Sequence, residues 1–134
     1  MRLGSAAIGM SFVLGLALAA EAGSIADRDG DLVPDAFDNC VEDANGPNQG
    51  LINQLDTNAD GYGNWCDADY NNDGRVDGAD FGIFVSFFGS GDLTADLTGN
   101  GLFDGGDFGR FIVLFNQPTG PSGLPCAGTI PCVP

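Results

Sequence analysis

Apolar residues recur with helical spacing in two short stretches of the chain. The spacing i, i+3, i+4, i+7 occurs first in Phe81, Phe84, Val85 and Phe88, and again 27 positions later in Phe108, Phe111, Ile112 and Phe115. This period is typical of amphipathic helices with one apolar face. We expect the two faces to pack against each other, so that both helices share one small core.

A polar loop of fixed spacing leads into each predicted helix. Loop positions 1, 3, 5, 9 and 12 carry oxygen-bearing side chains, and position 6 is glycine: the residues are Asp69, Asn71, Asp73, Asp77 and Asp80, then Asp96, Thr98, Asn100, Asp104 and Asp107. Position 7, which would offer its backbone carbonyl, is Arg75 or Leu102. Calcium takes six to eight oxygen ligands in loops of this kind. The pattern therefore predicts two calcium loops.

These loops differ from an EF-hand in two respects. The residues before each loop lack helical periodicity, and position 12 is Asp80 or Asp107 where an EF-hand usually has a bidentate glutamate. The predicted unit is one loop followed by one helix, taken twice. The predicted fold class is thus mainly irregular, calcium-stapled loops plus a small α component, with two loop–helix (F-hand) units.

The same spacing occurs twice more, nearer the N-terminus. The oxygen-bearing residues are Asp27, Asp29, Asp31, Asp35 and Asp38 in one loop, and Asp56, Asn58, Asp60, Asn64 and Asp67 in the next. Leu32 stands at position 6 of the first loop, where the others have glycine, so we expect that loop to turn differently or to bind less well. Few apolar residues lie in this region, and metal ions with a disulfide must replace a core.

The duplicated loop and helix of residues 67–117 resemble a type I dockerin. The resemblance implies a pair of F-hands around two calcium ions, and a secreted docking module that binds a cohesin domain, often in polysaccharide breakdown. In that family the helix surface contacts the partner. The side chains off the predicted core stripe are candidates for a partner surface, with packing on the N-terminal loops or the C-terminal tail as the alternative: Ile83, Phe87, Arg110, Val113 and Leu114.

The two N-terminal loops resemble thrombospondin type 3 repeats, which wrap a series of calcium ions. This resemblance implies a disulfide between Cys40 and Cys66, and it points to the alternative function of a calcium-stiffened structural or adhesive extracellular protein that binds no cohesin. Counting residues alone, four cysteines allow three pairings. The most local one, Cys40 with Cys66 and Cys126 with Cys132, is favoured.

Charge narrows the choice of partners and agrees with metal binding. The 134-residue chain has a net charge of −15 and contains neither lysine nor histidine. Nucleic acid is excluded as a partner, because its phosphates require a basic surface. From Gly23 onward, 15 of the 18 acidic residues stand at the ligand positions of the four loops. Four bound Ca²⁺ ions would bring the charge to −7.

The order of segments completes the prediction. Residues 1–22 read as a secretory signal peptide ending in an Ala-x-Ala site, with an uncleaved anchor as the alternative. Type 3-like repeats (23–67), a dockerin-like module (68–117) and a Pro/Gly-rich tail with a disulfide ring (118–134) follow. We expect a secreted, monomeric protein without a membrane span after cleavage, either free or held at a cell surface by its protein partner. No catalytic constellation is visible, so we expect no enzyme activity.

Overall fold

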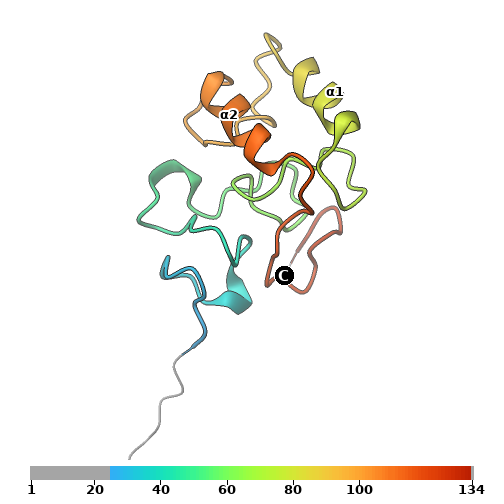
Figure 1. Cartoon of the computed structure of the whole chain (residues 1–134). Coiled ribbons are helices and arrows are strands. Elements are labelled where there is room, and N and C mark those ends of the chain that lie inside the picture. The colour runs from blue at the N-terminus through green and yellow to red at the C-terminus, as the bar shows by residue number, and fades with distance from the viewer. Residues whose placement is uncertain (1–24, 134) are drawn as a thin grey trace, which may run out of the picture.

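The fold consists mostly of irregular loops. A computed structural model of the chain describes residues 25–133, with two α-helices, α1 (Gly78–Ser86) and α2 (Gly105–Leu114), and two 3₁₀ turns, η1 (Asp35–Phe37) and η2 (Gly50–Ile52). Within this range there is no strand beyond a single bridge of Arg75 to Pro118. The predicted class of irregular loops with a little helix is confirmed (Figure 1). The proposed signal peptide lies outside the described residues.

Both helices begin in the same way, at the end of a polar loop. Asp77 and Asp104 are the N-cap residues, and their side chains accept hydrogen bonds from the backbone N–H groups of Ala79 and Gly106. The third helical residue, Asp80 or Asp107, accepts the N–H of the N-cap in return, which completes a capping box. The loop thus sets where each helix starts. No helix among the described residues is long and apolar enough to cross a membrane.

The core lies under the helices and takes residues from the loops as well. Phe84 of α1 and Phe111 of α2 are buried with ring centroids 4.7 Å apart, so the helices meet through these two rings. The other buried members of the cluster are Ala68, Val76, Ala95, Leu97 and Leu114. The prediction that the whole apolar stripe is buried is wrong, since Phe88 is 75% exposed and Ile112 54% exposed. Residues of the loops fill the space beneath the helices instead.

The predicted partner surface is divided between core and surface. Leu114 is buried in the core, and Phe87 packs on the same core beside Tyr70. Arg110 lies over the ring of Trp65, at 4.2 Å from its centroid, and donates to the Trp65 carbonyl oxygen. Val113 is exposed and Ile83 half-buried. These side chains therefore do not form one exposed face, because the helix side that carries Arg110 and Leu114 packs on the rest of the protein.

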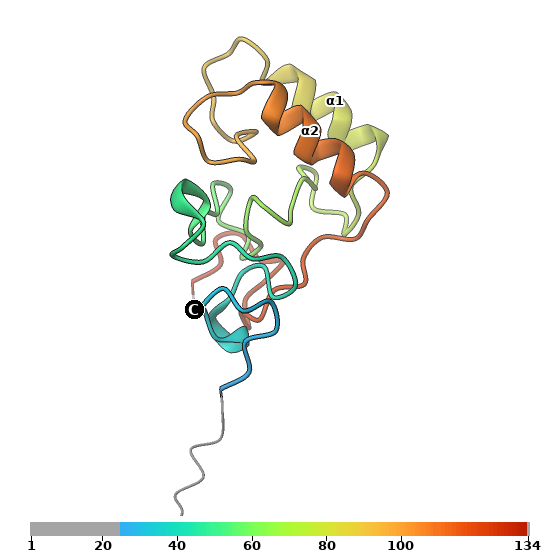
Figure 2. The ribbon, with the colours of Figure 1, turned by 60° about the vertical axis from the view of Figure 1, so that its left-hand side comes forward.

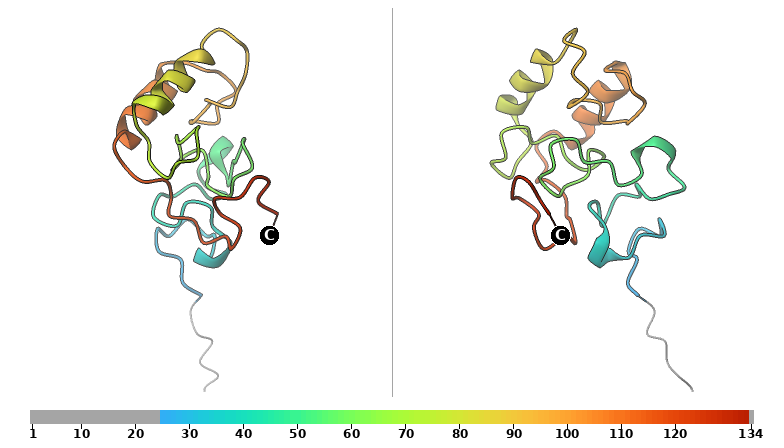
Figure 3. Two further views of the ribbon diagram at one scale, coloured as in Figure 1. Left: turned by 90° about the vertical axis from the view of Figure 1, so that its right-hand side faces the viewer. Right: turned by 180° about the vertical axis from the view of Figure 1, so that it is seen from behind.

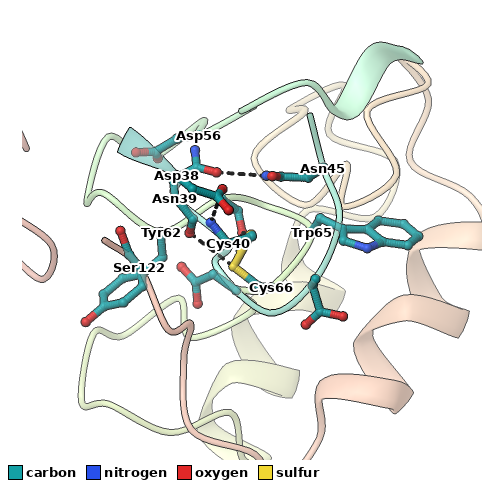
Figure 4. Close-up of a disulfide and its surroundings, with 12 residues drawn as sticks. Asp38, Asn39, Cys40, Asn45, Asp56, Tyr62, Trp65, Cys66 and Ser122 are labelled. Atoms are coloured by element: carbon teal, nitrogen blue, oxygen red, sulfur yellow. Dashed lines mark hydrogen bonds between the residues drawn. A yellow bond between two sulfur atoms is a disulfide. The ribbon is translucent and has the colours of Figure 1, made fainter. Parts of the chain in front are cut away.

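The N-terminal region has a polar centre beside its disulfide. Cys40 is bonded to Cys66, as predicted, and both are buried (Figure 4). Asn45 is fully buried next to them: its side chain donates to Asn39 Oδ1 and accepts from Gln54 Nε2 at 2.8 and 2.7 Å. Its backbone N–H reaches a carboxylate of the first loop. The Asn/Gly-rich segment 41–53 is thus fixed by hydrogen bonds.

The C-terminal tail runs back along both N-terminal loops (Figures 2 and 3). After α2 the chain pairs with Val76 through two backbone hydrogen bonds. Further along, tail residues bond the backbone of the N-terminal region in five pairs, 120 with 66, 121 with 41, 123 with 38, 128 with 60 and 132 with 59. The second predicted disulfide, between Cys126 and Cys132, is present in this segment. We call residues 118–133 the strap.

Removing the strap should loosen the N-terminal loops selectively. A chain ending at Gln117 loses five backbone hydrogen bonds to that region, each worth about 1 kcal/mol. We expect the free energy of unfolding to drop, by at most about 5 kcal/mol for these five bonds together. Thermal unfolding followed by circular dichroism measures this. The variant Ile130→Ser, which alters only an exposed side chain of the strap, serves as the control, and an equal melting temperature for truncated and full-length protein would contradict the role given to the strap.

Candidate metal centres

The four polar loops share one backbone conformation. In each of them positions 4 and 6 both have positive φ. The residues at position 4, with φ between 57° and 75°, are Gly30, Ala59, Asn72 and Gly99. Those at position 6, with φ between 80° and 93°, are Leu32, Gly61, Gly74 and Gly101. Leu32 thus makes the same turn as the glycines, and the expectation that the first loop turns differently is wrong.

Repeated hydrogen bonds fix the side-chain oxygens inside each loop. The carboxylate at position 1 accepts the N–H of position 6, at 3.2, 2.9, 2.6 and 2.7 Å in chain order, through Asp27, Asp56, Asp69 and Asp96. The oxygen at position 5 accepts the N–H of position 7, at 2.8, 2.9, 3.2 and 2.7 Å, through Asp31, Asp60, Asp73 and Asn100. The side-chain oxygens of each loop are therefore held by the backbone of the same loop. This arrangement suits a cation that takes only oxygen ligands.

The outer ligand positions divide the loops into two types. In the two C-terminal loops the fully buried Asp80 and Asp107 accept the N–H of position 3, at 3.1 and 2.9 Å. In the two N-terminal loops position 9 closes the ring instead, because Asp35 and Asn64 accept the N–H of position 2, at 2.7 and 2.9 Å. Position 12 of these loops bonds the chain that follows. In the C-terminal type, position 12 therefore links the loop to the start of a helix. In the N-terminal type, position 12 links the loop to the segment that follows it.

The first loop carries the clearest geometry for a cation. Carboxylate oxygens of Asp27, Asp29 and Asp31 all lie within 4.8 Å of one another. Asp29 Oδ2 and Asp38 Oδ2 are buried without a hydrogen-bond partner. A buried carboxylate oxygen without a donor is costly unless a cation binds it. The donor set is entirely oxygen, which fits calcium and not zinc, for which cysteine or histidine would be expected.

The pKa values of the loop carboxyls also indicate that added positive charge would stabilise the loops. Burial, as the largest cause, raises the pKa of five carboxyls above the usual 3.8: Asp29, Asp38, Asp56, Asp67 and Asp69. For Asp67 the neighbouring charge of Asp60 adds to the rise in pKa. Two of the described arginines are occupied elsewhere, Arg28 with Glu42 and Arg110 with Asp43. Divalent cations would relieve this crowding of negative charge.

The loops are also joined to one another. Asn64, predicted only as a ligand, donates from Nδ2 to the backbone carbonyl of Asp96 at 3.0 Å, and Thr57 donates to the carbonyl of Thr94. These bonds connect the second loop with the fourth. The sequence interpretation did not find them, nor the polar cluster around Asn45. It also missed the capping boxes, although the repeated Asp-x-x-Asp at the end of each C-terminal loop is a readable signal for them.

Comparison with known proteins identifies part of this architecture. Residues 26–48 and 55–81 match the family model of the thrombospondin type 3 repeat. These two segments are therefore thrombospondin type 3 repeats, a calcium-binding unit, and together with the disulfides they fit an extracellular protein. The second segment extends through the third loop, Asp69–Asp80, which the sequence analysis assigned to the dockerin-like module. No dockerin model matches. No curated protein and no solved structure matches the chain either.

The positive φ of Leu32 should lower the calcium affinity of the first loop. A non-glycine residue at positive φ costs roughly 1–2 kcal/mol, and Leu32 has a φ of 80° with its side chain 65% exposed. We expect Leu32→Gly to raise the calcium affinity of the first loop about fivefold, a gain of about 1 kcal/mol. Calorimetric titration measures it. The matched control is Leu102→Gly, an exposed leucine of another loop without positive φ, which should bring no gain. Equal behaviour of both variants would contradict the strain at Leu32.

Calcium binding should weaken on acidification at a higher pH than ordinary aspartates would cause. Carboxyls with a raised pKa in the metal-free fold keep protons above pH 3.8, and calcium must displace them. In the metal-free protein, folding favours the protonated form of these carboxyls. This contribution to stability is fully present below the pKa of the unfolded chain, and it is lost as the pH rises through the higher pKa of the folded chain. Titrations at pH 7 and pH 5 should show lower affinity and proton release at pH 5. Identical affinities at both values would refute the raised pKa values.

Proposed function

We propose that this protein is a calcium-stiffened extracellular structural module, in which four bound ions replace most of a hydrophobic core. The observation that carries the proposal is the fourfold repetition of one loop geometry, with the same pair of positive-φ positions and the same internal hydrogen bonds. The thrombospondin type 3 repeats found at 26–48 and 55–81 support calcium as the ion.

In this role the ions would act as structural parts. The two N-terminal loops bury polar residues such as Asp31, Asp38 and Asp60 where a larger domain would bury apolar ones. Ordering these residues without a cation leaves like charges close together in a partly dry interior. Ion binding would therefore supply folding free energy directly, as it does in small metal-dependent domains. No step of catalysis is part of the proposal, in line with the sequence analysis.

Calcium titration of the oxidised protein tests the proposal. Calorimetry should give about four ions per chain, and circular dichroism should show helix only with calcium present. Four matched variants, Asp27→Ala, Asp56→Ala, Asp69→Ala and Asp96→Ala, each remove the position-1 carboxylate of one loop and should each lower the number of bound ions by one. A chain that folds fully in a chelator, with no calcium bound up to millimolar concentration, would overturn the proposal.

A second candidate is a dockerin-like docking module that binds a protein partner. It is favoured by the two loop–helix units, whose capping boxes and position-12 bonds are alike, and whose helices meet through Phe84 and Phe111. A pair of F-hands would have this arrangement, and a cohesin-type partner in polysaccharide breakdown is what the dockerin resemblance implies. Titration with a type I cohesin domain in calcium separates the candidates, since only a docking module would bind it and lose binding in Asp96→Ala.

A further inference from the structure

The outer side of the two helices carries apolar side chains that no other part of the described chain covers. Six residues of the predicted core stripe are 36–75% exposed there: Phe81, Val85, Phe88, Phe108, Ile112 and Phe115. Only Phe84 and Phe111 of the stripe are buried. Figures 1 and 3 show both helices at one end of the molecule, away from the strap and the N-terminal loops. An apolar surface of this extent on a strongly acidic protein calls for a partner.

This surface is hollowed into a groove. A cavity of about 620 Å³ is lined by Phe81, Phe84, Val85, Phe88, Phe103 and Phe108, and also by Asp104 and Gly105. A second hollow of about 220 Å³ lies between Phe81, Phe108, Phe111, Ile112 and Phe115, and it shares two of the same rings. Ring contacts such as Phe84 with Phe103, at 4.7 Å, hold the walls in place. The groove is therefore already formed in the free protein.

Charge decides which occupants fit. The ionisable residue in the groove wall is Asp104, and the net charge of the chain is −15. A second copy of the chain would bring the same negative charge against it, and an anionic lipid surface would be repelled in the same way. Arg28 and Arg110 are held by acidic partners away from the groove. The occupant that fits this surface therefore has an apolar face with positively charged residues beside it.

Shape points to a helix as that occupant. The apolar residues of α1 that border the groove, Phe81, Val85 and Phe88, present ridges at helical spacing on one side, and α2 presents Phe108 on the other. A third helix can lay its i, i+3, i+4, i+7 side chains between two such ridges. We propose that the groove between α1 and α2 binds an amphipathic helix of a partner protein, with apolar residues facing the phenylalanines and Lys or Arg at its margins.

The test uses a defined probe, because it asks for a class of partner. The probe is a synthetic 18-residue Leu/Lys peptide with one apolar helical face, titrated into the calcium-loaded full chain and followed by fluorescence anisotropy at physiological salt. Two control peptides accompany it: the same composition scrambled so that no apolar face remains, and a Leu/Glu peptide with the original pattern. We expect the Leu/Lys peptide to bind at least tenfold more tightly than either control.

A matched pair of variants locates the binding. Phe88→Ser changes a groove residue that is 75% exposed, and Phe37→Ser changes a phenylalanine of the N-terminal region that is 70% exposed. We expect Phe88→Ser to weaken peptide binding at least tenfold and Phe37→Ser to leave it unchanged, with the number of bound calcium ions the same in both. Equal binding of the scrambled peptide, or no effect of Phe88→Ser, would overturn the proposal.

Two further outcomes separate this proposal from the alternatives. Equal binding of the Leu/Glu peptide would overturn the assignment of a basic partner. Light scattering that shows a dimer lost in Phe88→Ser would assign the groove to a second copy and also overturn it. A protein that binds calcium but no peptide refutes this inference alone, whereas a protein that binds no calcium refutes the proposed structural role, whatever the peptide does.

Discussion

Concentrated negative charge is the constraint on which this structure depends. Asp31, Asp38, Asp60, Asp80 and Asp107 are nearly or fully buried, and they stand where a domain of ordinary composition would have apolar side chains. Each is held by backbone N–H groups of its own loop or of the chain beside it. Such bonds orient the oxygens but leave the charge unbalanced, so bound cations would stabilise this fold.

The helical part depends on the same loops. Each helix begins on an aspartate pair that is also part of a polar loop, and the shared core takes Val76 and Leu97 from within those loops. A disturbance of a loop is therefore a disturbance of the helix start and of the core at once. This coupling explains how two helices of 9 and 10 residues, too short to be stable alone, are held in a definite arrangement.

The sequence allowed those features to be predicted that depend on fixed local spacing. The four loops and the two helices follow from spacing, because each ligand position is set by the turn of its own loop. The two disulfides are favoured as the most local of three pairings, and the bond between Cys40 and Cys66 is also implied by the resemblance to type 3 repeats. The buried helix face was not predictable in this way. Phe84 and Phe88 have the same periodicity, but Phe84 is 3% exposed and Phe88 75%, and the rest of the core comes from loop residues such as Val76 and Leu97. The hydrogen bonds of Asn45 and of the strap involve backbone groups or lone amides, which leave no period in the sequence.

The strap also has a consequence for the order in which the molecule can be completed. Residues 123 and 132 of the strap form backbone hydrogen bonds with Asp38 and Ala59. Residues that are bonded to each other therefore come from distant parts of the chain. During synthesis the N-terminus emerges first. The first two loops are therefore exposed before the strap that bonds to them has been made. Contacts this far apart in sequence also form late, because a long loop must close first. The N-terminal region would therefore stay open during synthesis and close only when the strap has formed its hydrogen bonds to it.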